Sequence, residues 1–235
     1  MPIDLQLSPR NPNTRNHSES AFQEGGVWDQ NQGANQTRLF AECFHKHSRI
    51  PFTAEFSVLD IGCALGDALP VWKMHYPQAR LFGCDVAESA ISRAKDRYGA
   101  IAKFFLAGFE DLQGRWDVIY CSNVMEHFEQ HVAIATALLA HCNVLYVMTP
   151  YLELRDGRSI VPEPGDFHVA TFDKKPFNSL EANHGAAIST KVVSCPGAWG
   201  NGIRSEFVSR VRSLWKGDVY APRRQVIYSI FSESK

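Results

Sequence analysis

The sequence lacks any long hydrophobic run. No segment reaches the roughly 18 consecutive apolar residues that a membrane-spanning helix needs. The polar first 20 residues, MPIDLQLSPRNPNTRNHSES, contain no apolar stretch of signal-peptide length. From this pattern we expect a cytoplasmic protein with no membrane partner.

The sequence also has no surplus of charge of either sign. Its 24 basic residues nearly balance its 25 acidic residues, for a formal net charge of -1 at pH 7. No general positive field would therefore attract a nucleic acid backbone or an anionic lipid surface. The composition argues against nucleic acid as a partner.

Paired cysteine motifs are absent as well. The six cysteines are dispersed and include no CxxC pair: Cys43, Cys63, Cys84, Cys121, Cys142 and Cys195. This spacing favours buried thiols in a reducing compartment over a disulfide framework or a zinc site. We expect no structural metal from it.

What the sequence does contain is enough apolar material for one fair-sized domain, since 45% of its residues are hydrophobic. Residues 1–50 predict a polar tail followed by an amphipathic helix near 30–47, which together form an N-terminal helical cap. The main domain is predicted to occupy residues 51–235.

Short apolar runs alternate with helical patterns along the main domain. Strands are expected at 57–61, 80–84, 102–106, 117–121 and 143–148, with helices at 67–76, 88–98 and 127–141. Two later strands, at 189–195 and 223–231, flank a helical pattern at 203–216 and can add an antiparallel edge. Because parallel strands need crossover connections, the alternation predicts a doubly wound α/β domain.

The stretch FSVLDIGCALGDALP, residues 56–70, is the strongest local signal. Gly62 and Gly66 allow a tight turn after the first strand and a close approach of the backbone to a ligand. In open parallel sheets, ligands bind beyond the carboxyl ends of the strands. For the glycine pair alone, an ordinary strand-to-helix turn remains the alternative.

A second signal supports a nucleotide-like ligand. Asp85 ends the second strand, where a carboxylate can accept hydrogen bonds from both hydroxyls of a ribose, although it can equally cap the following helix. The fingerprint of NAD-binding turns needs a third small residue where Asp67 stands. The carboxylates of Asp60 and Asp67 disfavour a pyrophosphate and suit a ligand with a cationic amino group.

Four segments in order resemble class I S-adenosylmethionine-dependent methyltransferases, in particular their ubiquinone-biosynthesis-like small-molecule branch. VLDIGCALGD resembles the first motif, LFGCDVAESAISRAK the acidic ribose-binding motif, FFLAGFEDL the adenine-side loop, and WDVIYCSNVMEHF the fourth-strand segment. The resemblance covers residues 58 to about 150. It implies a Rossmann-like methyltransferase fold, with a mostly parallel seven-stranded sheet and an antiparallel last strand, and S-adenosyl-L-methionine as cofactor.

The resemblance also implies roles for individual residues. The cofactor-binding set is Asp60, Gly62, Ala64 and Gly66 near the methionine part, Asp85 at the ribose, Val86, Phe109 and Glu110 at the adenine, and Asn123 at the end of the fourth strand. Ala64 departs from the family's middle glycine, and Gly108 stands where relatives often carry an aspartate. In the resembling families, the segment corresponding to 150–182 covers the substrate.

Two histidines are the candidate catalytic residues. Methyl transfer from a sulfonium needs near-attack geometry and the removal of one proton, and imidazole titrates near neutral pH. The fold would place His127 at the cofactor end of the sheet and His168 in the substrate-side segment. The alternatives are a helix-start role for His127, together with Glu126, and a solvated loop position for His168.

Four other histidines give no sign of a metal site. None of His45, His47, His75 and His141 has the HxxxH or carboxylate spacing typical of metal ligands. We expect His45 and His47 on the exposed side of the early helix, and we expect no metal dependence.

The resulting hypothesis is an S-adenosyl-L-methionine-dependent methyltransferase acting on a small molecule, with a hydroxyl oxygen of a sugar or other metabolite as the favoured acceptor. Nitrogen and carbon acceptors stay open. A non-catalytic protein that keeps the cofactor fold as an interaction module is the rival from a different class. A nicotinamide-dependent oxidoreductase is disfavoured by the spacing of the glycine turn.

Overall fold

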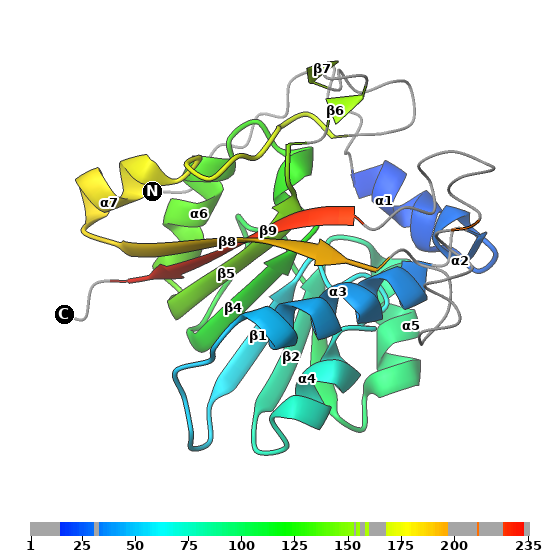
Figure 1. The fold of residues 1–235 in the computed structure, drawn as a ribbon. Coiled ribbons are helices and arrows are strands. Elements are labelled where there is room, and N and C mark those ends of the chain that lie inside the picture. Colours follow the sequence, from blue (N-terminus) through cyan, green and yellow to red (C-terminus); the bar gives the residue numbers. More distant parts are fainter. Residues whose placement is uncertain are drawn as a thin grey trace.

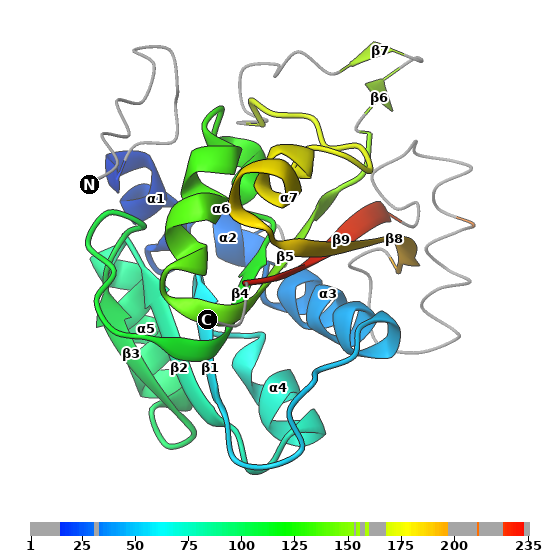
Figure 2. The same cartoon turned by 90° about the vertical axis from the view of Figure 1, so that its left-hand side faces the viewer.

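A seven-stranded sheet with helices on both faces forms the centre of the protein (Figure 1; Figure 2). The computed structural model describes residues 15–30, 33–152, 154–155, 158–159, 168–196, 211 and 223–232. The strand order is β3-β2-β1-β4-β5-β9-β8. This arrangement confirms the doubly wound α/β fold predicted from the sequence.

Five strands of the sheet pair in parallel, and β9, inserted between β5 and β8, is the one described strand of this sheet that runs in the opposite direction. The parallel strands are β1 (Ser57–Ile61), β2 (Arg80–Asp85), β3 (Ala102–Leu106), β4 (Trp116–Ser122) and β5 (Cys142–Pro150). The strand β9 (Arg223–Phe231) pairs antiparallel with β5 and with β8 (Ala187–Cys195). All seven predicted strands are therefore confirmed. A separate short pair comprises β6 (Leu154–Arg155) and β7 (Arg158–Ser159).

The helices divide between the two faces of this sheet. The helices are α1 (Arg15–Phe22), α2 (Val27–Gln30), α3 (Gly33–His47), α4 (Leu69–His75), α5 (Glu88–Tyr98), α6 (His131–Leu139) and α7 (Asn178–His184), with a 3-10 turn η1 (Met125–His127). Side chains of α3, α4 and α5 share one hydrophobic cluster, and those of α6 and α7 share the other. In the part of the chain that the structure describes, no helix is both long and apolar enough to span a bilayer.

Successive side chains of a parallel strand point to opposite faces of the sheet, so each strand contributes to both hydrophobic clusters. In β1, Val58 faces the cluster under α3 and α4, while Leu59 and Ile61 face the cluster under α6. Every residue of β1 is buried. Strands buried on both faces read as continuous apolar runs, and this is the pattern by which the sequence predicted them.

One predicted helix begins later than expected. The sequence pattern placed a helix at 127–141, whereas His127 ends the turn η1 and α6 begins at His131. The backbone of Phe128 is extended, which breaks the helical path between the two. The predicted helix at 203–216 lies outside the described residues apart from Val211.

Helix α3 is anchored in the core rather than lying loosely over it. Phe44 is fully buried, and its ring centroid lies 5.5 Å from that of Trp72 and 4.8 Å from that of Tyr120. The predicted domain boundary near residue 50 stays a prediction. The polar tail predicted for residues 1 to about 20 was wrong for its last part, since residues 15–20 belong to helix α1, and residues 1–14 lie outside the described residues.

Two of the six cysteines differ from the expectation of free thiols. Cys43 of α3 and Cys195 of β8 form a disulfide across a sequence separation of 152 residues. The remaining four, at positions 63, 84, 121 and 142, are free and buried as expected. Two cysteines so far apart give no pairing signal in the sequence, because only the packing of α3 against β8 brings them together.

The expectation that His45 is exposed was also wrong. Both of its ring nitrogens are buried and have no hydrogen-bond partner among the described residues, and the ring lies against Trp72 and His75 at centroid distances of 4.5 Å. Burial, and secondarily the neighbouring His75, lower the pKa of His45 to about 3. The folded protein therefore holds this ring in its neutral form.

This buried neutral ring predicts a pH dependence of stability. The pKa of His45 is about 3 in the folded protein, against 6.5 for an ordinary solvated histidine, so between these values the unfolded chain binds a proton that the folded chain does not. Stability should fall as the pH drops through that window, by up to about 1.4 kcal/mol per pH unit.

We expect His45→Phe to remove this contribution to the pH dependence. Between pH 7 and pH 5, the free energy of unfolding of the wild type should fall by up to about 2 kcal/mol more than that of the variant, as measured by urea denaturation. His141→Gln, at the amino end of β5, serves as the matched control. Equal pH dependence of the wild type and His45→Phe would show that the pKa of His45 is nearly the same in the folded protein as in the unfolded chain.

Candidate functional site

The predicted site residues gather at the carboxyl edge of the parallel strands. Because β1 to β4 run in the same direction, the segments that follow them leave the sheet at one edge. The residues in or directly after these strand ends are Asp60, Gly62, Ala64, Gly66, Asp85, Val86, Phe109, Glu110, Asn123 and His127. The structure thus places the proposed cofactor residues along one edge.

The turn after β1 needs its two glycines for conformational and steric reasons. Gly62 and Gly66 have φ values of +71° and +79°, and Ala64 between them has +47°. A Cβ at Gly62 would lie 2.6 Å from a methyl group of Val124, and one at Gly66 would lie 2.9 Å from the ring of Phe104. Ala64 occupies a left-handed conformation that favours glycine, which is the residue that the family motif has there.

Asp85 connects this turn to the start of α5. Its Oδ2 accepts a hydrogen bond from the Ala64 N-H at 3.0 Å, and its Oδ1 accepts one from the Ala87 N-H at 3.0 Å. Burial raises the pKa of Asp85, and hydrogen bonds from the backbone, including these two, oppose that shift. The capping role considered in the sequence was wrong, because the N-cap of α5 is Ala87 and no side chain makes a capping hydrogen bond there; Asp85 bonds the N-H of Ala87 itself rather than one in the first helical turn. A carboxylate has about four lone-pair positions, so acceptor positions remain for a ligand.

Asp60 is a second buried carboxyl group at the same edge. It is only 3% exposed. Burial, followed by the nearby charge of Asp85, raises the pKa of Asp60 well above its ordinary value. Two acidic groups this close disfavour an anionic ligand and favour a cationic one.

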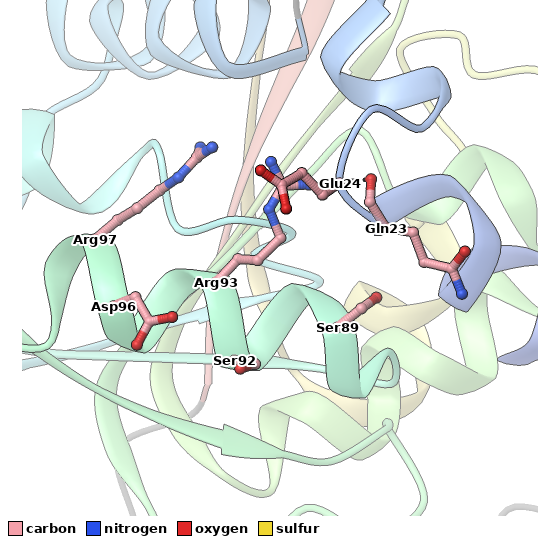
Figure 3. Close-up of a pocket in the computed structure, with 7 residues that line it drawn as sticks. All are labelled: Gln23, Glu24, Ser89, Ser92, Arg93, Asp96 and Arg97. Atoms are coloured by element: carbon pink, nitrogen blue, oxygen red, sulfur yellow. Dashed lines mark hydrogen bonds between the residues drawn. The ribbon is translucent and has the colours of Figure 1, made fainter.

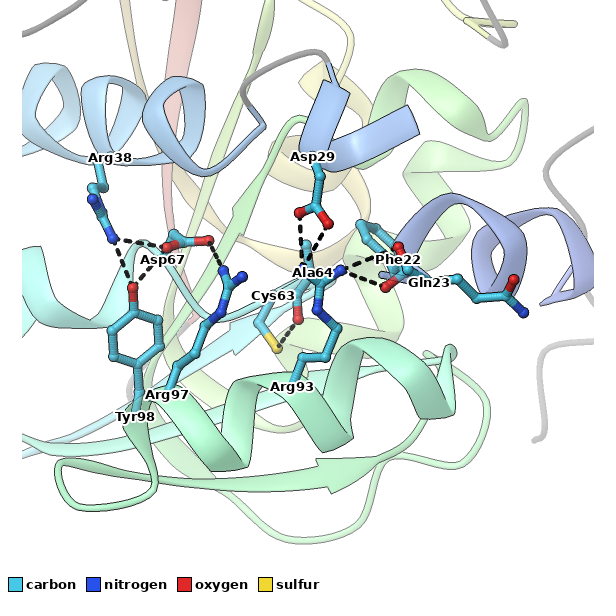
Figure 4. Close-up of polar contacts among 10 residues, drawn as sticks. All are labelled: Phe22, Gln23, Asp29, Arg38, Cys63, Ala64, Asp67, Arg93, Arg97 and Tyr98. Carbon is cyan, nitrogen blue, oxygen red and sulfur yellow. Dashed lines mark hydrogen bonds and ion pairs between the residues drawn. The ribbon is translucent and has the colours of Figure 1, made fainter. Parts of the chain in front are cut away.

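Asp67, by contrast, is neutralised by the protein itself. Its Oδ1 accepts hydrogen bonds from Arg38 at 3.1 Å and from the Tyr98 hydroxyl at 2.7 Å, and Arg97 lies 3.8 Å from its Oδ2 (Figure 4). The cationic partners of Asp67 are therefore side chains of α3 and α5. Asp67 was expected to face the amino group of a ligand. Its contacts instead fasten α3 and α5 to the glycine turn.

The short helices α1 and α2 cover the turn from outside. Phe22 and Trp28 pack on a small apolar cluster made by Leu65, Ala87 and Ala90. Arg93 of α5 pairs with both carboxylate oxygens of Asp29 at 2.9 and 2.8 Å, and donates to the Phe22 carbonyl at 2.8 Å (Figure 4).

A polar pocket lies where the α1–α2 connection meets α5 (Figure 3). Its lining residues are Gln23, Glu24, Ser89, Ser92, Arg93, Asp96 and Arg97. None of the residues of the glycine turn lines it. This pocket is therefore distinct from the carboxyl-edge site.

Two of the residues predicted to contact the adenine, and Asn123, also follow strand ends at this edge. The ring of Phe109 packs edge-on against that of Phe128 at 5.2 Å, and Glu110 is exposed. Asn123 has a φ of +54°, and its N-H donates to the Met148 carbonyl at 2.7 Å. That bond fastens the turn after β4 to β5.

The two predicted catalytic histidines lie together. The ring centroids of His127 and His168 are 4.9 Å apart. Glu126 adjoins both, because one ligand atom from each of the three side chains lies within 4.8 Å of the others. The two rings are far apart in the sequence, and only the path of the segment after β5 brings them into contact.

Glu126 is the residue that the sequence reasoning undervalued. It is 1% exposed, its Oε2 accepts a hydrogen bond from the Thr149 hydroxyl at 2.9 Å, and its backbone carbonyl accepts from Val169 and Ala170 at 2.8 and 3.0 Å. It therefore joins η1 to β5 and to the segment that carries His168. The sequence signal that could have identified Glu126 was its position directly before His127 and shortly after a buried strand.

Comparisons with known proteins agree with this geometry. The model of the methyltransferase domain family matches residues 35–185. Trans-aconitate 2-methyltransferase of Deinococcus radiodurans is 24% identical over 104 residues, which is 43% of this chain. That match spans only 40% of the relative's length.

Solved methyltransferase structures share the fold. Magnesium protoporphyrin IX methyltransferase from Synechocystis, with bound S-adenosylhomocysteine (SAH), has a TM-score of 0.56 and 14% identity, covering 86% of this chain and 84% of that one. The plantazolicin methyltransferase BpumL, in complex with a monoazolic desmethylPZN analog and SAH, has a TM-score of 0.59 and 19% identity, covering 93% and 95%. Likenesses at such identities show the fold alone.

The family match decides the question of identity, because it covers more than half of the chain and includes the glycine turn, Asp85 and Glu126. The fold class, the enzyme class and the cofactor that the motifs implied are confirmed. The chain belongs to the methyltransferase domain family, within the class I S-adenosylmethionine-dependent methyltransferases.

Proposed function

We propose that this methyltransferase transfers the methyl group to a hydroxyl oxygen of a small-molecule acceptor, such as a sugar or another metabolite. The observation that carries the proposal is the pair of half-buried histidines, 4.9 Å apart, at the cofactor edge of the sheet. Small molecules appear in the names of similar proteins, which include a trans-aconitate and a magnesium protoporphyrin IX methyltransferase.

The residues of the carboxyl edge suit S-adenosylmethionine, which supplies a methyl group on a cationic sulfonium when bound. We assign the methionine part of the cofactor to Asp60, Gly62, Ala64 and Gly66, and its ribose to Asp85. The adenine is assigned to Val86, Phe109 and Glu110. Asn123, directly after β4, completes the proposed cofactor-binding set. The fit rests on two features: the left-handed backbone of the turn at residues 62–66 and the unused acceptor positions of the Asp85 carboxylate.

We propose that His127 or His168 accepts the proton that leaves the acceptor hydroxyl. A hydroxyl is a weak nucleophile until its proton begins to leave, and a neutral imidazole nitrogen within hydrogen-bond reach can accept that proton. His127 is fixed by η1 at the sheet edge, whereas His168 belongs to the segment that follows β5. The protein's remaining task is to hold the hydroxyl in line with the methyl carbon.

The ribose assignment predicts a loss of cofactor affinity in Asp85→Asn. The variant removes the charge that strengthens the hydrogen bonds to the hydroxyls, and its affinity for SAH should fall by about 1.5 to 3 kcal/mol in calorimetric titration. Asp117→Asn is the matched control, because Asp117 also holds backbone and side-chain donors, at Ser57, but at the opposite edge of the sheet.

An altered ligand distinguishes a direct contact between Asp85 and the ribose from an indirect effect of the substitution on the glycine turn. An SAH analogue without the ribose 2′-hydroxyl should bind the wild type more weakly than SAH does, but should bind Asp85→Asn about as well as SAH does. If the analogue loses the same affinity in both proteins, Asp85 acts only through its hydrogen bonds to the backbone of Ala64 and Ala87.

The catalytic assignment predicts that His127→Ala or His168→Ala slows methyl transfer and leaves SAH affinity nearly intact. General acid-base assistance typically contributes about 100- to 10,000-fold, so single-turnover transfer to an acceptor found by a metabolite screen should fall within that range. His141→Ala is the control.

Three outcomes of that experiment would count against the proposal. Wild-type rates in both variants would exclude a histidine base. Methylation confined to amines or to carbon would correct the acceptor class. A wild type that binds SAH but methylates nothing in a broad screen would favour the non-catalytic module.

A further inference from the structure

The group formed by Glu126, His127 and His168 has a feature that a proton-accepting histidine pair does not require. Among the described residues, this is the single set of three or more histidine, cysteine or acidic side chains whose ligand atoms converge, all within 4.8 Å of one another. Its members come from η1 and from the segment after β5, so the fold rather than the local sequence assembles it.

The Glu126 carboxylate is the unusual member. It is 1% exposed, and although its Oε2 accepts a hydrogen bond from Thr149, its Oε1 is buried and has no hydrogen-bond partner among the described residues. A buried carboxylate oxygen without a donor is costly, so buried charges are normally paired or bound to a metal. A cation held between this oxygen and the two rings would remove that cost.

We propose that Glu126, His127 and His168 bind one divalent transition-metal ion, with Zn²⁺ as the best match. Two imidazole nitrogens and one carboxylate oxygen form a donor set that suits Zn²⁺ and related ions, whereas Mg²⁺ and Ca²⁺ prefer oxygen ligands alone. Three protein ligands leave coordination positions open for water or for an acceptor oxygen.

The surroundings of the carboxylate support such a site. The Thr149 hydroxyl orients Oε2, and the bonds from the Val169 and Ala170 N-H groups to the Glu126 carbonyl hold the His168 segment against η1. Hydrogen bonds of this kind position metal ligands before the ion binds. Ligand atoms on one ion at about 2.0 to 2.2 Å lie roughly 3 to 4 Å apart, so small rotations of the half-buried rings would complete the site.

The metal site deepens the proposed function, on which it rests because it uses the same two histidine rings. The metal site can be refuted while the proposed function holds. A ring nitrogen that coordinates an ion cannot also accept a proton, so the metal-bound pair and the proton-accepting pair are alternative states of the same rings. With an ion bound, an acceptor hydroxyl on an open position would become more acidic through coordination and release its proton to solvent.

The test uses the full chain without a histidine tag, freed of metals with a chelator and then titrated calorimetrically with Zn²⁺. We expect one equivalent to bind with a dissociation constant in the micromolar range or below. Co²⁺ should give a visible absorption band that reports nitrogen and oxygen ligands, and Zn²⁺ should displace it.

Variants locate the ion. Glu126→Gln keeps the shape of the side chain and an oxygen for the Thr149 hydroxyl but removes the charge, and His168→Gln removes one ring; each should weaken Zn²⁺ binding by at least about 100-fold, since even residues that only support a ligand cost about 10- to 100-fold. His141→Gln, at the opposite edge of the sheet, should leave binding unchanged. Circular dichroism and SAH affinity confirm that each variant is folded.

The outcomes separate this inference from the proposed function. If the wild type binds no Zn²⁺ or Co²⁺, or if His141→Gln weakens binding as much as His168→Gln does, the metal site is refuted, whatever the methyltransferase activity. Full activity of the metal-free protein beside tight Zn²⁺ binding would retain the site and leave the histidines as the base.

Discussion

The carboxylate of Asp85 is the contact on which the cofactor edge depends. Through hydrogen bonds of 3.0 Å to Ala64 and to Ala87, it fixes the glycine turn after β1 relative to the first turn of α5. The cost is a buried acid whose pKa is raised by desolvation. The same group therefore joins the turn to the start of α5 and, in the function proposed above, presents acceptor positions to a ribose, so a substitution there is expected to affect both.

The acceptor side repeats this design with Glu126. Its side chain bonds Thr149 of β5, and its carbonyl bonds the segment at Val169 and Ala170. The rings of His127 and His168, far apart in the sequence, thus lie together beside the buried carboxylate of Glu126. Asp85 ends β2 and Glu126 follows β4, so the parallel direction of the strands is what brings the proposed cofactor residues and the histidine pair to one edge of the sheet.

The sequence predicted the fold well and located the sheet edge at which the proposed cofactor residues gather, because both depend on local patterns. Short apolar runs located all seven strands, and the glycine turn with Asp85 located the edge. What it missed depends on contacts between distant segments. The disulfide of Cys43 and Cys195, the burial of His45 against Trp72, and the meeting of Glu126 with His168 follow from packing that no short motif encodes.

The most direct test of the central claim, that the carboxyl edge holds the cofactor beside the histidine pair, is a crystal structure of the protein with SAH. The account predicts the ribose hydroxyls within hydrogen-bond distance of Asp85 and the sulfur directed toward His127 and His168. SAH bound elsewhere, such as in the polar pocket against α5, or a sulfur directed away from both histidines, would contradict it.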